Sequence, residues 1–81
     1  MAIVDQQGNM LYDYVGTSIQ MYDEIVYPYR RGSTLELHKG SIVGYDPGDA
    51  FTPHALKVKT VCADGREREV RITRIDNVVV L

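Results

Sequence analysis

The most regular alternation of apolar and polar residues lies between Leu56 and Ile72. Leu56, Val58 and Thr60 alternate with lysines, and Val70 and Ile72 alternate with charged residues. A period of two is expected where one face of a strand is buried and the other faces water. This stretch therefore predicts a β-hairpin.

The turn of this hairpin decides which side chains share a face. A two-residue Asp64-Gly65 turn mixes apolar and charged positions on each face, so that no face can be buried cleanly. A three-residue loop, Ala63-Asp64-Gly65, sets Val58 opposite Val70 and supplies glycine where a left-handed backbone is needed. We expect this second register, which also sets Leu56 opposite Ile72 and Lys59 opposite Glu69.

Shorter apolar runs predict further strands along the chain. Gly40 and Gly44 fall inside one of them and permit the bend or bulge that a small barrel requires. Pro28 lies late in another and favours an edge position or a bulge, because proline has no N–H to donate. No internal repeat is evident. Strands are expected at residues 2–4, 10–15, 23–29, 37–45 and 78–81, with a loop or one helical turn at 17–22 and a helical or 3₁₀ turn at 74–77.

Short strands separated by turn signals are typical of a sandwich or a small barrel. We predict a single all-β domain over residues 1–81, in which residues 21–81 form a small SH3-like five-stranded barrel. Residues 1–16 are expected to form an N-terminal strand or hairpin arm. Short terminal strands need a partner, so this arm lies along the main sheet or reaches a second subunit and makes a homo-oligomer.

Composition and charge narrow the function classes. The chain has 81 residues, is 44% hydrophobic and carries a net charge of −2. No apolar run approaches the roughly 20 residues of a membrane span, and the first residues do not resemble a signal peptide. The single cysteine, Cys62, falls on the apolar side of its strand and predicts a buried, inert thiol. We expect a reduced, cytoplasmic protein with no membrane contact.

The order of four segments resembles small SH3-like proteins encoded by phages of actinobacteria. The segments are DEIVY at 23–27, RRGSTLELHKGSIVGY at 30–45, ALKVKTV at 55–61 and REVRITRIDNVVVL at 68–81. The stretch IVDQQGNML at 3–11 is similar to the short leader strand of that group. Most of the group has no assigned function. The resemblance implies the barrel fold and a phage accessory protein that acts in the cytoplasm of the host cell.

A second likeness is set aside. LYDY at 11–14 and LELHKG at 35–40 are similar to two motifs of eukaryotic SH3 domains. Those motifs lie much closer together in SH3 domains. This chain also has no tryptophan to form the base of a groove that binds proline-rich ligands. We therefore predict no binding of PxxP peptides.

The residues for catalysis or metal binding are sparse. His38, His54 and Cys62 are too few and too widely spaced for a zinc site, and both histidines are expected to be solvated in or beside loops. Asp46 and Asp49 flank a Pro-Gly turn and need no catalytic role. We expect no catalytic residues, no metal, no cofactor and no enzymatic activity.

The excess of tyrosine suggests a contact surface. Tyr27 and Tyr45 are expected to fill the core, whereas Tyr12 and Tyr14 stand outside if Leu11 is buried. Tyrosine and arginine are concentrated at protein interfaces. The predicted protein-binding residues are Tyr12, Tyr14, Tyr29, Arg30 and Arg31.

The basic C-terminal half offers an alternative. Residues 51–81 hold six basic and four acidic residues, whereas residues 1–50 hold three and seven. Small barrels with basic strands and surface aromatics bind nucleic acid, and here Lys57, Lys59, Arg68 and Arg71 are the candidates. A solvated face with cross-strand ion pairs explains the same residues more simply. We therefore favour a non-enzymatic module that contacts a host or phage protein, with nucleic-acid binding as the alternative.

Overall fold

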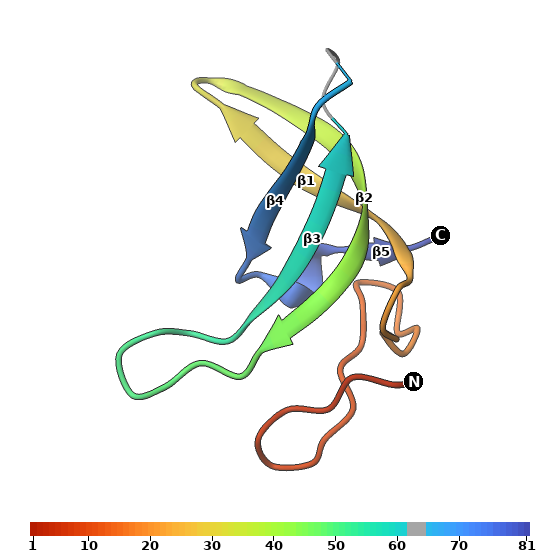
Figure 1. Cartoon of the computed structure of the whole chain (residues 1–81), viewed down its shortest axis with the longest axis vertical. Coiled ribbons are helices and arrows are strands. Elements are labelled where there is room, and N and C mark those ends of the chain that lie inside the picture. The colour runs from red at the N-terminus through yellow and green to blue at the C-terminus, as the bar shows by residue number, and fades with distance from the viewer. Residues whose placement is uncertain (62–64) are drawn as a thin grey trace.

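The computed structural model describes residues 1–61 and 65–81 of the chain. Its elements are five strands and one short 3₁₀ turn (Figure 1). They are β1 (Glu24–Arg31), β2 (Thr34–Asp46), β3 (Ala55–Val61), β4 (Glu67–Ile72), η1 (Ile75–Asn77) and β5 (Val79–Val80).

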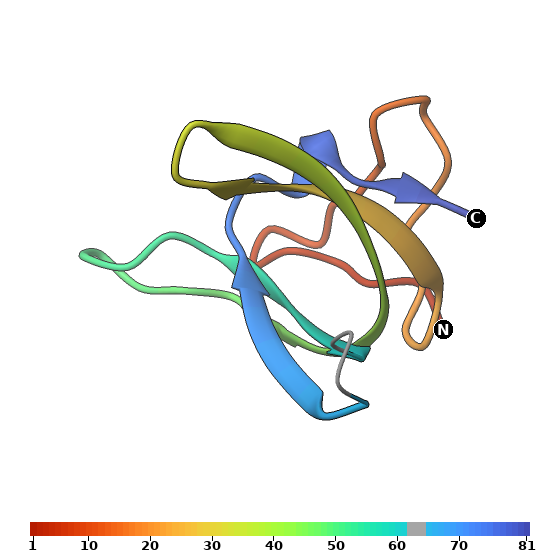
Figure 2. The same cartoon turned by 90° about the horizontal axis from the view of Figure 1, so that it is seen from above.

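The strands form one antiparallel sheet in the order β4-β3-β2-β1-β5, which confirms the all-β prediction. The sheet curves until β4 faces β1 across the interior, as Figure 2 shows, although no ladder joins these two strands in the part of the chain that is described. β4 and β5 are therefore the two edges of an open sheet.

The register of the β3–β4 hairpin is the predicted one. Val58 lies opposite Val70, and Leu56 lies opposite Ile72. The alternation of burial follows, because Leu56 and Val58 are fully buried while Lys57 and Lys59 are exposed. Gly65 has a φ of 86°, as the turn prediction required. The rest of that turn, and the predicted burial of Cys62, lie outside the described residues.

The core lies inside the curved sheet and is closed by residues from both ends of the chain. Ile25, Ile42, Leu56, Val58 and Val78 are all fully buried. Burying an aliphatic side chain of this size contributes about 1.5–3 kcal/mol, so this cluster supplies much of the driving force for folding.

A bulge and a close approach shape β2. The register with β3 shifts between Ile42 and Gly44, which is the bulge that the glycines predicted. At Gly40 a Cβ would lie 2.5 Å from Val58 Cγ1 and 2.9 Å from the Lys59 carbonyl oxygen. Only glycine lets β2 approach β3 this closely.

The N-terminal residues pair more sparsely than the predicted strand or hairpin arm, since the runs 2–4 and 10–15 share a single bridge, Val4 to Met10. They form no extended strand, and isolated bridges join Ala2 to Gln20, Val4 to Met10 and Tyr12 to Ser18. The segment 1–23 folds back on itself at two turns, 5–8 and 13–16, so that Ile3, Leu11 and Ile19 meet in the core. Their backbones form a closed ring of hydrogen bonds: Ile3 N–H donates to the Ile19 carbonyl, Leu11 N–H to Ile3, and Ile19 N–H to Leu11.

The ring reveals an internal repeat, so the expectation of none was wrong. Its three members stand eight positions apart, at 3, 11 and 19. In the first two units an aspartate follows two residues later, Asp5 or Asp13, and a glycine of positive φ follows that, Gly8 or Gly16. Each aspartate accepts hydrogen bonds from N–H groups two and four residues on, which closes the turn.

The remaining element predictions were correct to within a few residues. β1 and β2 extend beyond the predicted 23–29 and 37–45, and η1 falls inside the predicted turn at 74–77. Residues 17–22 form a loop without a helical turn, with Tyr22 at a φ of 71°.

Candidate functional site

The structure divides the predicted protein-binding residues between two ends of the molecule. Tyr12 and Tyr14 are exposed on the N-terminal segment, 53% and 74%, because Leu11 and Asp13 take the buried positions. Arg31 ends β1 at the tip of the β1–β2 hairpin, which lies at the opposite end of the molecule from the N-terminal segment (Figure 1). The two further members, Tyr29 and Arg30, precede it on the same strand. The five residues do not form one patch.

The predicted nucleic-acid set is divided between the two faces of the sheet. Lys57 and Lys59 alternate with buried neighbours, Arg71 alternates with half-buried ones, and all three lie on the outer face. Arg68 has the parity of Val70 and lines the inner face instead. Lys59 Nζ pairs with Glu67 Oε2 at 3.0 Å, diagonally rather than with the predicted Glu69. On the outer face Lys59 and Arg71 form ion pairs with Glu67 and Asp46, and the charge of Lys57 also lowers the pKa of Asp46.

The histidines are not the solvated side chains that we expected. His38 stacks on Tyr29 with ring centroids 4.8 Å apart, and His54 Nδ1 lies 2.8 Å from the Tyr45 hydroxyl. Both rings are half-buried. Within residues 1–61 and 65–81, no three His, Cys, Asp or Glu side chains gather closely enough to hold a metal ion.

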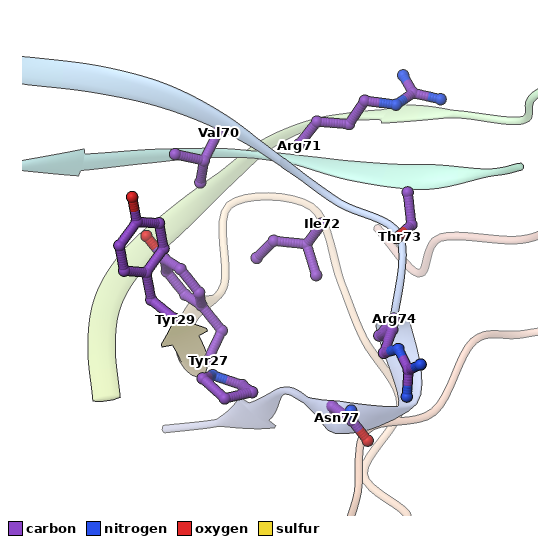
Figure 3. Close-up of a pocket in the computed structure, with 9 residues that line it drawn as sticks. Tyr27, Tyr29, Val70, Arg71, Ile72, Thr73, Arg74 and Asn77 are labelled. Atoms are coloured by element: carbon purple, nitrogen blue, oxygen red, sulfur yellow. The ribbon is translucent and has the colours of Figure 1, made fainter. Parts of the chain in front are cut away.

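A cleft runs between β1 and β4, where the sheet is open. It consists of two adjoining hollows of about 250 and 340 Å³ that share Tyr27, Tyr29 and Val70 in their lining. Figure 3 shows Tyr27 and Tyr29 from β1 and Val70 and Ile72 from β4 directed into the same space. We call these hollows and their lining the β1–β4 cleft.

Aromatic rings form one wall of the β1–β4 cleft. Tyr29 stacks on His38, and Tyr27 meets the same imidazole edge-on at 5.9 Å. Tyr27 is only 3% exposed, and its hydroxyl has no hydrogen-bond partner among the described residues. A buried hydroxyl without a partner costs about 1–3 kcal/mol. This hydroxyl lies closed to solvent behind the wall of the cleft.

The β1–β4 cleft is basic although the whole chain is acidic. Arg31 and Arg68 line one hollow and Arg74 the other, and no ion pair engages them within the described part of the chain. Arg71 also borders the cleft, but its guanidinium points away and binds Asp46. Among the described lining residues Glu36 is the only acidic one. The cleft thus favours an anionic occupant.

A second candidate surface is the loop between β2 and β3. Phe51, the single phenylalanine of the chain, is 97% exposed at this loop. Asp49 Oδ1 accepts hydrogen bonds from Phe51 N and Thr52 N, both at 2.8 Å, and Asp49 N donates to the Thr52 carbonyl. These bonds fix the backbone that presents the phenylalanine. We call residues 46–54 the Phe51 loop.

The base of the Phe51 loop is closed by one contact between its ends and is tied to two other parts of the molecule. The Tyr45 hydroxyl and His54 Nδ1 join its two ends. Asp46 accepts a hydrogen bond from Arg71 of β4, and Arg71 also donates to the Pro53 carbonyl. Gln6 of the N-terminal segment donates to the Gly48 carbonyl at 3.0 Å. The loop is therefore held in one shape.

The ionisation of these groups reflects the same bonds. The hydrogen bond from Arg71 lowers the pKa of Asp46, and the N–H groups of Phe51 and Thr52 lower the pKa of Asp49. Burial raises the pKa of Tyr45. Both carboxylates are charged and Tyr45 is neutral at physiological pH, so the loop keeps its bonds there.

The sequence carried little signal for either surface. Phe51 follows the Asp-Pro-Gly-Asp turn. Its position beside two aspartates that favour turns was the one sequence signal that this apolar side chain is exposed. The cleft depends on the curvature of the sheet, which brings β1 and β4 together from positions about forty residues apart in the sequence.

Comparison with known proteins leaves the family open: no protein-family model, no curated protein and no solved structure matches the chain. Within the described residues, no helix is long and apolar enough to cross a membrane.

Proposed function

We propose that the protein is a non-enzymatic interaction module that binds another protein through the Phe51 loop. The observation that carries this proposal is the exposure of Phe51, at 97%, on a backbone held by side-chain hydrogen bonds. An aromatic side chain that fills a partner's pocket is a typical centre of binding energy.

The rigidity of the loop supports the proposal. Ordering a flexible loop on binding opposes association, and a loop that is already ordered avoids most of that cost. Asp46, Asp49 and Gln6 order the Phe51 loop before any partner arrives. The partner then needs an apolar pocket of the size of a phenyl ring, with polar or basic groups at its rim to face Asp49.

The proposal extends to fold and origin. The curved sheet around one core supports an SH3-like barrel that is open between β1 and β4. With the sequence resemblance described above, we infer a phage accessory protein that acts on a host or phage protein inside an actinobacterial cell.

A pull-down from actinobacterial lysate tests the role of Phe51. The tagged protein is compared with Phe51→Ser, which removes the exposed ring and leaves the core untouched. We expect at least one protein to be enriched about tenfold or more by the native chain and to be lost with Phe51→Ser, since a central aromatic contributes 2 kcal/mol or more by typical alanine scans.

Val15→Ser is the matched control, because Val15 is also largely exposed, at 66%, but lies on the N-terminal segment. It should retain the partner. Asp49→Ala keeps the ring but removes the acceptor that orders the loop, so it should weaken capture by a smaller factor. Equal enrichment by the native chain and Phe51→Ser contradicts the proposal.

A further inference from the structure

We propose that the β1–β4 cleft is a second binding site, which takes an extended acidic segment of a partner protein as an added strand on β4. The site is independent of the Phe51 loop, and it goes beyond the function proposed above because it would let one chain join two partners. The argument rests on a free strand edge, a basic lining and an aromatic wall.

The free edge of β4 is open for pairing. β4 pairs with β3 alone in the described structure, and its six residues include neither proline nor glycine. One side of its backbone therefore presents N–H and C=O groups without strand partners. Extended peptides bind such edges by adding a strand, with main-chain hydrogen bonds for affinity and side-chain pockets for specificity.

The facing edge of β1 is less suitable. Glu24 accepts a hydrogen bond from Leu81 N on the β5 side, so the alternation of backbone groups points Val26, Pro28 and Arg30 to that side as well. β5 has only two residues and ends its pairing at Val26. Beyond it Pro28 offers no N–H, which protects this edge from pairing. The asymmetry selects β4 as the strand that receives the peptide.

The chemistry of the inner row of β4 defines the occupant. Arg68, Val70 and Ile72 share the inner face, and Arg74 lines the same cleft just beyond the strand. An added strand that follows this row meets a cation, two apolar side chains and a second cation. The matching sequence alternates, with acidic residues at the two ends of its inward face and β-branched apolar residues between them.

The aromatic wall fits the same occupant. Tyr27 and Tyr29 stand across the cleft from Val70 and can pack on the apolar residues of the peptide (Figure 3). Arg31 adds a further positive charge at the Arg68 end. Glu36, the one acidic residue of the described lining, lies beside His38.

Peptide titration followed by fluorescence anisotropy tests the proposal. The probe is fluorescein-labelled Glu-Thr-Val-Thr-Val-Thr-Glu, which presents the required inward face in either strand direction. We expect saturable binding, and a loss of about tenfold or more with Arg68→Glu, since a charged contact is replaced by repulsion. The probe with lysine in place of both glutamates should not bind the native chain and should gain affinity for Arg68→Glu.

Controls separate this site from general electrostatics. Lys57→Glu makes the same change in charge on the outer face and should alter binding by less than about twofold, because exposed charges outside the site are screened. Arg74→Glu repeats the test at the other end of the cleft if Arg68→Glu fails to fold. N-methylation of the peptide along one edge should abolish binding, and along the other edge should leave it intact, as strand addition requires.

Several results overturn the proposal. No saturable binding of the acidic probe does so, as does equal sensitivity to Lys57→Glu and Arg68→Glu. Binding of single-stranded oligothymidine that depends on Arg68, without peptide binding, assigns the cleft to nucleic acid. A doubled molar mass in light scattering that Arg68→Glu abolishes assigns it to a second copy of the chain. Phe51→Ser should bind the probe normally, so failure here leaves the proposal for the Phe51 loop standing.

Discussion

The N-terminal segment, residues 1–23, and the five-stranded sheet build one core, but they satisfy their backbone groups in different ways. The sheet uses long ladders, with eight pairs between β1 and β2 and six between β3 and β4. The segment uses isolated bridges, the ring of Ile3, Leu11 and Ile19, and the side chain of one buried aspartate. Both contribute side chains to a single cluster of buried residues.

This difference indicates where single substitutions should destabilise the fold most. A ladder distributes its hydrogen bonds over many residues, so that one altered side chain leaves most of them in place. The segment concentrates its bonds at a few points. Asp13 illustrates this: it is 6% exposed, and its carboxylate accepts hydrogen bonds from Val15 and Thr17 in its own turn and from Val80 of β5.

The largest effect is expected for Ile19→Ala. Ile19 is fully buried and joins the backbone ring to the common core. Truncating a buried isoleucine to alanine costs about 2–5 kcal/mol through lost burial and the cavity left behind. Urea denaturation should show this loss in the free energy of unfolding as one cooperative transition, because segment and sheet share the core.

Two outcomes break the comparison at this point. A biphasic transition means that the segment unfolds separately, and the predicted arm that reaches a second subunit becomes the better description. A loss below about 1 kcal/mol means that the ring is not anchored in the core. The control is Val15→Ala, which alters an exposed side chain of the same segment and should change stability by less than about 0.5 kcal/mol.

The next effect is expected for Asp13→Asn. Burial raises the pKa of Asp13, but the N–H donors of Val80, Thr17 and Val15 outweigh burial and the pKa is lowered. Asparagine has one carbonyl oxygen in place of two acceptors, so at least one buried N–H loses its partner or meets an NH₂ group. The loss at neutral pH should be about 2 kcal/mol.

The pH dependence identifies the cause. A carboxyl group whose pKa is lower in the folded state stabilises the fold fully above its unfolded pKa of about 3.9, and loses this contribution as the pH falls through the folded pKa. The difference in stability between the native chain and Asp13→Asn should therefore shrink below about pH 4. A difference that is independent of pH contradicts a role for the charged carboxylate.

The β3–β4 hairpin could be predicted from the sequence because its information is local. The alternation from Leu56 to Ile72 and one glycine are enough to set the register, since a slip of one residue exposes an apolar face. The tip of the β1–β2 hairpin and the 3₁₀ turn at Ile75 followed from similar local signals. These elements contain within a few residues the partners that stabilise them.

The N-terminal segment and the candidate site could not be predicted in the same way. The ring joins three residues eight positions apart, and the residues between them show neither the sustained alternation of a strand nor the i, i+3, i+4 pattern of a helix. Tyr12 and Arg31 are both of residue types that are common at protein interfaces. Only the curvature of the sheet determines that Arg31 lines the cleft and Tyr12 does not. Tertiary structure supplied what local pattern did not.

The remaining substitutions concern two glycines that serve the two regions for different reasons. Gly40→Ala places a methyl group 2.5 Å from Val58 Cγ1 and 2.9 Å from the Lys59 carbonyl oxygen, and overpacking of this kind costs about 1–3 kcal/mol. Gly16 has open space around it but a φ of 89°. Alanine there costs about 1–2 kcal/mol of backbone strain, partly offset by a gain of about 0.4–1 kcal/mol from the unfolded state.

Double substitutions distinguish the two causes, measured again by urea denaturation. Val58→Ala removes one of the two atoms that Gly40→Ala meets, so the pair should cost less than the sum of the single changes. Gly16→Asn should recover much of the loss of Gly16→Ala, because asparagine tolerates the left-handed conformation and alanine does not. If Asn and Ala are equally costly at position 16, the turn does not depend on its positive φ. In that case the buried ring and Asp13 alone determine the shape of the segment. If the costs at Gly40 and Val58 are additive, the contact with the Lys59 carbonyl, and therefore the backbone of β3, sets the spacing between β2 and β3.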